Sequence, residues 1–335
     1  MSLVETASLQ RRHWLALTAG LWLLPGRATV HERRELFGGP VDLLLDERSP
    51  PRAAVSVLRG LEAMNRKWNA WKPGDVATVN RAFAAGRAVQ PTREVWGLIQ
   101  GAAALERLSA GYFNAGVGAM VAGWGFHADR LEDGTGPGRR EIEAWTRTRP
   151  SLSQIEHRQG WLRSRNPRLQ LDFGGYAKGV ALDWALDRLA LSGVRGAVLN
   201  LGGNLAAMGD RGTQPWSIGV QDPSGPGLMA RLAIQGREAV VTSGTYQRYR
   251  YVDGVRHSHL MDPNSGRPVA ELISVTVVHP SASLADAAAT ALLVAGASRW
   301  RGLAERMGID QVLVVDPQGR RMATPALQRR LAWES

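Results

Sequence analysis

A carboxylate and a hydroxyl stand four residues apart at Asp286 and Thr290, within a run of small apolar residues. Residues four apart lie on the same face of a helix, so both oxygens point the same way. Mg²⁺ takes oxygen ligands from proteins and usually keeps further oxygens from water or substrate phosphates. The pair therefore indicates a magnesium site. The alternative is that Asp286 caps the start of the helix, but a cap would leave Thr290 unexplained.

A second polar segment contains Gly174, Gly175 and Lys178 at an expected helix start. Backbone N–H groups at such a start can face an anion, and glycines let a ligand approach the backbone closely. A lysine in the first turn opposes the helix dipole unless an anionic partner lies beside it. The segment fits either a phosphate-binding turn or a plain strand-to-helix turn.

Another glycine pair, Gly202 and Gly203, follows an expected buried strand at residues 197–201. Glycines at a strand end leave the backbone N–H groups open to a ligand. This pair either supplies further donors to an anion or forms a simple hairpin turn.

The region from residue 242 to residue 266 gathers hydroxyls, an arginine, two histidines and a carboxylate in a hairpin-like stretch. Its members of interest are Ser243, Tyr246, Arg248, His257, His259 and Asp262. A His-x-His pair can bind a metal, but zinc is disfavoured because the chain has no cysteine and no third ligand close by in the sequence.

Periodicity predicts which elements position these groups, and the mixture favours the α+β class because strands do not alternate regularly with helices. The expected helices are 54–68, 92–109, one from Tyr176, 283–295 and 299–307, and the expected strands are 35–46, 161–163, 169–172, 197–201, 216–220, 230–234, 273–278 and 311–315.

Composition removes several classes of protein. The absence of cysteine in 335 residues excludes disulfide scaffolds, thiol nucleophiles and cysteine-ligated metals. The sequence also lacks the P-loop, Rossmann, G-x-S-x-G and H-E-x-x-H motifs. The net charge of +11 comes mainly from scattered arginines rather than from one basic stripe, which argues against nucleic-acid binding.

Residues 1–28 have the pattern of an export signal. Arg11 and Arg12 precede an apolar run at residues 14–24, which is shorter than the about 20 apolar residues of a membrane-spanning helix. We expect cleavage after Ala28. The paired arginines resemble a twin-arginine signal and predict a periplasmic protein. An ordinary secretory signal and an uncleaved anchor are the alternatives.

Taken together and in this order, the segments resemble the ApbE family of FAD:protein FMN transferases. The matching segments are 68–80, 111–126, 174–179, 200–203, 242–246, 259–263 and 286–290. The resemblance implies an α+β domain over residues 29–335, with mixed sheets, packed helices and two intertwined subdomains. It also implies Mg²⁺-dependent transfer of FMN from FAD to a threonine hydroxyl of an exported or membrane redox protein, with release of AMP.

The resemblance assigns roles to individual residues. Asp286, Thr290 and the carbonyl of Ala177 would hold Mg²⁺. His259 would accept or orient the threonine proton, Asp262 would support the site, and Lys178 would face the phosphates. The other residues expected to bind the dinucleotide are Gly174, Gly175, Gly202, Gly203, Ser243, Tyr246 and Arg248.

Two further functions fit the same residues. In a Mg²⁺-dependent FAD pyrophosphatase, water would replace the threonine and the products would be FMN and AMP. A non-catalytic FAD-binding accessory factor would bind the dinucleotide without turnover. The expected partners are FAD and an acceptor in an electron-transfer complex, with peripheral contact with membrane complexes and no nucleic acid.

Overall fold

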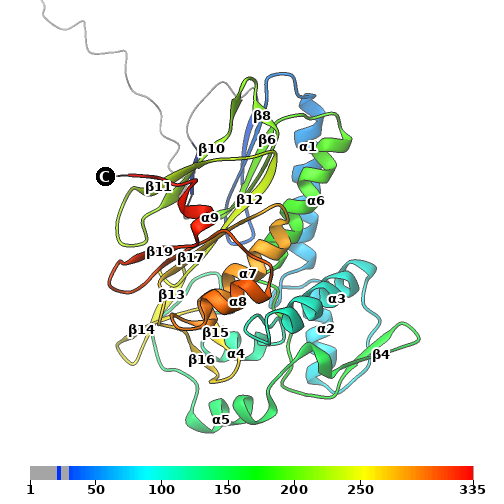
Figure 1. The fold of residues 1–335 in the computed structure, drawn as a ribbon. Coiled ribbons are helices and arrows are strands. Elements are labelled where there is room, and N and C mark those ends of the chain that lie inside the picture. Colours follow the sequence, from blue (N-terminus) through cyan, green and yellow to red (C-terminus); the bar gives the residue numbers. More distant parts are fainter. Residues whose placement is uncertain (1–20, 24–29, 335) are drawn as a thin grey trace, which may run out of the picture.

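The computed structural model of the chain describes residues 21–23 and 30–334. An eight-stranded antiparallel sheet forms the middle layer, with helices on one face and a four-stranded antiparallel sheet on the other (Figure 1). The large sheet has the order β19 (Arg321–Ala323), β18 (Val312–Val315), β17 (Ser274–His279), β12 (Arg237–Gly244), β7 (Asn204–Met208), β6 (Ala197–Leu201), β3 (Gly39–Leu45) and β2 (Val30–Leu36). The small sheet has the order β1 (Leu21–Leu23), β10 (Ser217–Gln221), β11 (Leu228–Ala233) and β20 (Ala332–Trp333).

The remaining described elements are helices and two-stranded hairpins. The helices are α1 (Pro51–Lys67), α2 (Asp75–Ala84), α3 (Arg93–Leu108), α4 (Gly118–Gly123), α5 (Arg139–Thr148), η1 (Leu152–Gln154), α6 (Ala177–Leu191), α7 (Ala282–Ala295), α8 (Trp300–Arg306) and α9 (Pro325–Gln328). The hairpins are β4–β5 (Ile155–Arg158, Trp161–Ser164), β8–β9 (Asp210–Arg211, Gln214–Pro215), β13–β14 (Tyr249–Val252, Val255–Ser258) and β15–β16 (Met261–Asp262, Arg267–Pro268).

The large sheet is covered on both faces, so its central strands are apolar on both sides. In β12, Val241 belongs to the core under the helices, whereas its neighbour Val240 belongs to the core between the two sheets. Successive side chains of a strand point to opposite faces. This double burial explains why the central strands read as continuous apolar runs.

Helix α7 lies directly on the large sheet, where it contacts β12 and β17 and also packs against α6. Half of its 14 residues are alanines, and most of its residues are buried. Small side chains let a helix approach its neighbours closely. The sequence Asp286–Thr290 is thereby held at a fixed place between the sheet and α6.

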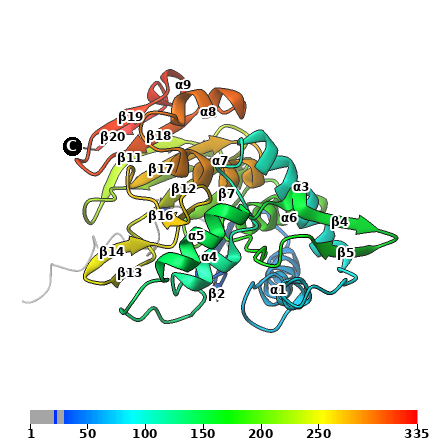
Figure 2. The ribbon, with the colours of Figure 1, turned by 90° about the horizontal axis from the view of Figure 1, so that it is seen from below.

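Two insertions in the large sheet pack against each other. Residues 46–196, between β3 and β6, contain α4 and α5, whereas residues 245–273, between β12 and β17, contain the β13–β14 and β15–β16 hairpins. Trp124 and Trp145 from the first insertion share a core with Val252 and Met261 from the second. Figure 2, seen from below, shows these segments in front of the sheet. This interleaving matches the expected intertwined α+β architecture.

Most of the predicted helices and buried strands are present, but two expectations were wrong and one helix was missed. Residues 35–46 do not form one strand, because the chain turns at Phe37 and Gly38, which have φ values of 55° and 79°, between β2 and β3. Residues 169–172 make only an isolated bridge, between Gln170 and Val117. Helix α2 was not predicted, although Val76, Val79 and Phe83 bury one helical face.

The predicted export signal falls mainly outside the described residues, which within it include only Leu21–Leu23. These three residues form strand β1, which pairs with β10 at the edge of the small sheet. In the part of the chain that the structure describes, no helix has both the length and the apolar character needed to cross a membrane.

The start of α7 is capped from α6. Asp183 accepts hydrogen bonds from the N–H groups of Ala282 and Ser283, at 2.8 and 2.9 Å. We expect Asp183→Ala to lower the free energy of unfolding by about 1–2 kcal/mol, because these donors lose their acceptor. Urea denaturation measures the change. The control Asp187→Ala removes an exposed carboxylate of the same helix and should change the free energy by less than about 0.5 kcal/mol; equal losses in both variants would contradict the capping role.

Candidate active site

The expected metal pair lies on α7, and the carboxylate of Asp286 is almost completely buried, with 2% exposure. Its Oδ2 accepts a hydrogen bond from the N–H of Gly179 at 2.9 Å, and its Oδ1 accepts one from Asn204 Nδ2 at 2.8 Å. The N-cap of α7 is Ser281, whose side chain accepts from the N–H of Leu284. The alternative reading of Asp286 as a helix cap is therefore wrong.

Burial raises the pKa of Asp286, while the nearby Lys178 ammonium and the donors Gly179 and Asn204 act in the opposite direction. A buried carboxylate is costly unless positive charge lies beside it. The two groups that donate hydrogen bonds to this carboxylate, the Gly179 N–H and the Asn204 amide, are neutral. The position thus favours a cation next to Asp286.

Thr290 lies one turn further along α7 and faces two other elements. Its Oγ1 is 3.2 Å from the Oγ of Ser243, at the end of β12. A Cβ atom added to Gly175 would lie 2.6 Å from the same Oγ1, closer than nonbonded atoms can approach. The structure therefore brings together three of the predicted segments, and Gly175 must be glycine because Thr290 occupies the space of a side chain.

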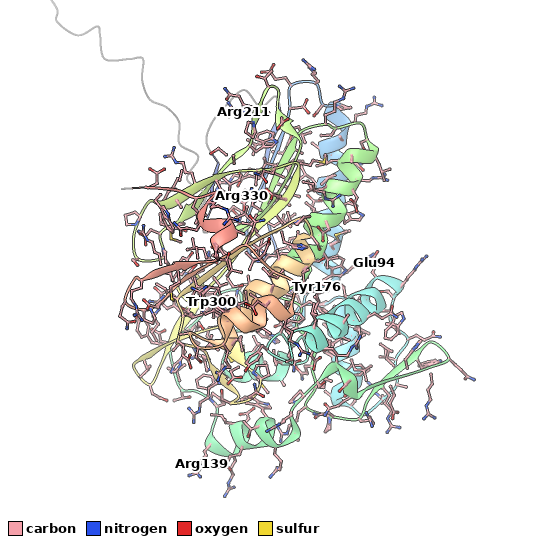
Figure 3. The ribbon with its side chains drawn as sticks, in the orientation of Figure 1. Glu94, Arg139, Tyr176, Arg211, Trp300 and Arg330 are labelled. Atoms are coloured by element: carbon pink, nitrogen blue, oxygen red, sulfur yellow. The ribbon has the colours of Figure 1, made fainter. Side chains whose placement is uncertain are left out.

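The start of α6 is fixed by aromatic packing. Tyr176, the residue before α6, lies where α6, α7 and α3 approach one another (Figure 3). A Cβ on Gly101 of α3 would lie 2.1 Å from the Tyr176 hydroxyl oxygen. Ala177, the first residue of α6, is buried and directly precedes Lys178. That the Ala177 carbonyl is a metal ligand stays a prediction.

Lys178 lies close enough to act electrostatically on both Asp286 and His259. Within residues 21–23 and 30–334, no carboxylate lies within ion-pair distance of its Nζ. An ammonium at a helix start that makes no direct ion pair is available to an anionic ligand. This arrangement agrees with the predicted phosphate-facing role of Lys178.

His259 follows β14 and is held by the backbone of Arg248. Its Nδ1 lies 3.1 Å from the Arg248 carbonyl oxygen, and because a carbonyl oxygen only accepts, Nδ1 carries the proton in this hydrogen bond. Burial is the main cause that lowers the pKa of His259 to about 4, with the charges of Arg248 and Lys178 acting in the same direction. At neutral pH, Nε2 is therefore an unprotonated acceptor.

Arg248 is committed to neighbouring carbonyl groups. Its Nη2 donates to the carbonyl oxygens of Phe126 and Ala128 at 2.6 and 2.7 Å, and its guanidinium lies 5.9 Å from the ring centroid of Trp71. These bonds fix its position between the two insertions. Its predicted contact with the dinucleotide would use the N–H groups that these carbonyls leave open.

Gly202 and Gly203 have a structural role instead of the expected ligand-binding one. The N–H of Gly202 donates to the carbonyl of Pro40 at 2.8 Å, and the N–H of Gly203 donates to Asn200 Oδ1 at 2.9 Å. With φ values of 56° and 97°, both residues form the tight turn between β6 and β7. The expectation of free backbone donors here was wrong, and the hairpin alternative describes the turn.

Asp262 also serves a turn. Its Oδ1 accepts from the N–H of Asn264 at 2.9 Å and its Oδ2 from the N–H of Ser265 at 3.3 Å, which shapes the β15–β16 hairpin. The structure thus gives Asp262 a local supporting role.

Tyr246 packs its ring against Gly244, and burial raises its pKa to about 12, so its hydroxyl stays protonated.

Sequence reasoning missed one polar pair beside the glycine turn. The Oδ2 of Asp172 lies 2.9 Å from His127 Nε2, while its Oδ1 accepts from the N–H of Gly174 at 2.8 Å. Burial raises the pKa of Asp172, but the hydrogen bond and charge of His127 outweigh it and the pKa is lowered. Trp71 stacks on His127 with ring centroids 4.8 Å apart. A carboxylate two residues before a pair of glycines is the signal that could have revealed this pair.

The described residues contain no group of three or more His, Asp or Glu side chains able to hold a metal ion. A metal at this site would therefore depend on mixed oxygen ligands, namely a carboxylate, hydroxyls and backbone carbonyls. Such ligands suit Mg²⁺.

Comparison with known proteins identifies the family and the fold. The family model described as the ApbE family matches residues 37–313. The chain belongs to the ApbE family. Its structure resembles the crystal structure of the ApbE protein from Thermotoga maritima with a TM-score of 0.81 and 28% identity, covering 90% of this chain and 98% of that one.

Two curated ApbE relatives are named FAD:protein FMN transferase. The one from Rhodobacter capsulatus is 37% identical over 330 residues, which cover 96% of this chain but 63% of that protein. The one from Vibrio cholerae is 28% identical over 318 residues, which cover 91% of this chain and 94% of that protein. The predicted ApbE family is confirmed, and the expectation of an enzyme is confirmed with it because these relatives bear an enzyme's name.

Proposed function

We propose that this ApbE chain transfers FMN from FAD to a threonine hydroxyl of an exported or membrane redox protein and releases AMP. The observation that carries the proposal is the convergence of Asp286, Thr290 and Lys178 with the unprotonated Nε2 of His259. Transfer of a phosphoryl-type group depends chiefly on positioning and on neutralising charge. The names of the relatives support the same reaction.

The bonds of the reaction balance without a redox partner. The threonine oxygen forms a bond to the phosphorus of the FMN half, and the bond from that phosphorus to the bridging oxygen of FAD breaks, so AMP leaves. The threonine proton is taken up or oriented at His259 Nε2, which is free because Nδ1 donates to Arg248. Lys178 stabilises the negative charge on the phosphates.

We propose Mg²⁺ as the metal, held by Asp286, Thr290 and the carbonyl of Ala177. The buried carboxylate, whose hydrogen-bond donors are neutral, fits a hard cation. When bound, the ion would neutralise charge on the phosphates and leave positions for their oxygens. Gly174, Ser243, Tyr246 and Arg248 would hold the dinucleotide next to this site.

The close approach of Gly175 to Thr290 gives a test of the metal geometry. We expect Gly175→Ala to weaken the apparent Mg²⁺ affinity about 10- to 100-fold, because the new Cβ displaces the Thr290 hydroxyl. The measurement is the Mg²⁺ concentration that gives half-maximal FMN transfer. Gly97→Ala, where nothing lies within 4 Å of the added Cβ, should leave this concentration unchanged. An unchanged value in Gly175→Ala would remove Thr290 from the ligand set.

We also propose that residues 1–28 direct export and that the mature enzyme acts in the periplasm. The paired arginines before an apolar run support this location. Mass spectrometry of periplasmic and membrane proteins, in strains with and without the gene, tests function and acceptor together. The expected result is an FMN-modified threonine peptide that disappears without the gene. Flavinylated peptides that are equal in both strains would overturn the proposal.

A further inference from the structure

The β13–β14 hairpin stands out from the body of the molecule in two perpendicular views (Figures 1 and 2). One face of it is packed against α4 and its flanking residues. Val252 is buried there with Trp124, and Arg250 Nη1 donates to the Trp124 carbonyl at 3.0 Å. The ring of His257 lies 5.1 Å from the Trp124 ring. This inner face anchors the hairpin.

The outer face of the hairpin displays two tyrosines. Tyr249 is 40% exposed and Tyr251 is 44% exposed, and their rings meet edge to face at 6.1 Å. The guanidinium of Arg256 lies 4.0 Å from the Tyr249 ring centroid. Tyrosine and arginine are the side chains most enriched at the energetic centres of protein interfaces. Their packing here already restricts the side chains before any partner binds.

Both ends of the hairpin are at the candidate active site. Arg248 directly precedes β13 and His259 directly follows β14, and the N–H of His259 donates to the Arg248 carbonyl at 3.2 Å. Along a strand rising about 3.3 Å per residue, Tyr251 lies roughly 10 Å from Arg248. A protein seated on the outer face therefore reaches His259 without any change in the hairpin.

Charge specifies what kind of partner fits. Arg256 is exposed, and among residues 21–23 and 30–334 no carboxylate forms an ion pair with it. Its recorded polar contact is a hydrogen bond to the Thr245 carbonyl at 3.4 Å. A partner that offers a carboxylate to Arg256 and apolar groups to the tyrosines would match this face.

We propose that the outer face of the β13–β14 hairpin, formed by Tyr249, Tyr251 and Arg256, is the docking surface for the acceptor protein. The acceptor places apolar side chains on the two tyrosines and a carboxylate on Arg256, which brings its target hydroxyl to His259. This inference rests on the proposed FMN transfer and adds the surface that selects the protein substrate. The residues proposed above to hold FAD do not include these three side chains.

The test compares the wild-type chain with Tyr249→Ser/Tyr251→Ser, using FAD, Mg²⁺ and the purified acceptor protein identified by the strain comparison. The expected result is a KM for the acceptor raised about tenfold or more, with an unchanged kcat at saturation and an unchanged Kd for FAD. Arg256→Glu should raise the same KM and reverse the contribution of this pair to the salt dependence of KM, because an attractive pair becomes a repulsive one that salt screens.

Two control variants make the result specific. Tyr249→Phe/Tyr251→Phe keeps the apolar rings and should raise KM by less than about threefold. Trp161→Ser removes an exposed aromatic ring, 48% exposed, from the separate β4–β5 hairpin and should leave KM unchanged.

Three outcomes would overturn the docking surface. The first is an unchanged acceptor KM in the serine double variant, and the second is an equal rise of that KM in Trp161→Ser. The third is a change in oligomeric state of the serine double variant, measured by light scattering, without a change in KM. That result would mean that a second copy of the chain covers this face. Failure of the proposed function is distinct, because the wild-type chain would then transfer no FMN to the acceptor.

Discussion

Asp286→Asn is expected to reduce Mg²⁺-dependent FMN transfer about a thousandfold, because a bound metal supplies several kcal/mol of charge stabilisation. The carboxylate is buried on α7 and positioned by Gly179 and Asn204. Asparagine has the same shape and keeps one acceptor for these two donors. Alanine would leave both donors unsatisfied, so the asparagine variant separates loss of the metal ligand from loss of the fold.

The free energy of unfolding of this variant is expected to lie within about 1 kcal/mol of the wild-type value, because one hydrogen bond is lost while a buried charge is removed. Activity against Mg²⁺ concentration, FAD affinity without metal, and urea denaturation are the measurements. Asp187→Asn, an exposed carboxylate on α6, should retain full activity. Full activity of Asp286→Asn with Mg²⁺ would remove Asp286 from the metal site.

His259→Asn is expected to slow FMN transfer by about 10²- to 10⁴-fold, the usual contribution of a positioned acid–base group. The asparagine amide nitrogen can replace Nδ1 as donor to the Arg248 carbonyl, so the variant removes chiefly Nε2. Single-turnover transfer to the acceptor, with FAD binding measured separately, tests the expectation. A variant that retained more than a third of the wild-type rate would show that His259 takes no proton.

The lowered pKa of His259 also fixes the pH dependence. An ordinary histidine becomes protonated below about pH 6.5, but the pKa of His259 is about 4, so its unprotonated form persists above that value. The contribution of His259 to transfer should therefore be constant between pH 8 and pH 6 and be lost only near pH 4. An acidic limb centred near pH 6.5 that disappears in His259→Asn would contradict this assignment.

Local patterns predicted the elements that carry the site better than the contacts that complete it. The spacing of Asp286 and Thr290 and the glycine turn before α6 are visible in short windows of sequence. Periodicity also predicted α7 and the buried strand β6, because one repeat dominates each window. Helix α2 was not predicted: its buried face repeats every three to four residues, but the helix spans only ten residues directly after Gly74.

The contacts that were not predicted join residues far apart in the chain. Asn204 donates to Asp286 across 82 positions, and His127 meets Asp172 across 45. Neither pair leaves a pattern in a local window, because tertiary packing alone sets these distances. The same reason explains Gly202, whose N–H donates to the carbonyl of Pro40 on a distant strand. The N–H of Gly203 instead donates to the nearby Asn200 side chain once the hairpin has formed.

The most direct test of the central claim incubates the purified chain with FAD, Mg²⁺ and the acceptor protein and then weighs the acceptor by mass spectrometry. We predict one FMN attached to a threonine, an equal amount of released AMP, and no product with Asp286→Asn. Release of free FMN and AMP with no modified acceptor would instead identify an FAD pyrophosphatase. FAD that stays bound and intact would identify a non-catalytic carrier, and either result would contradict FMN transfer.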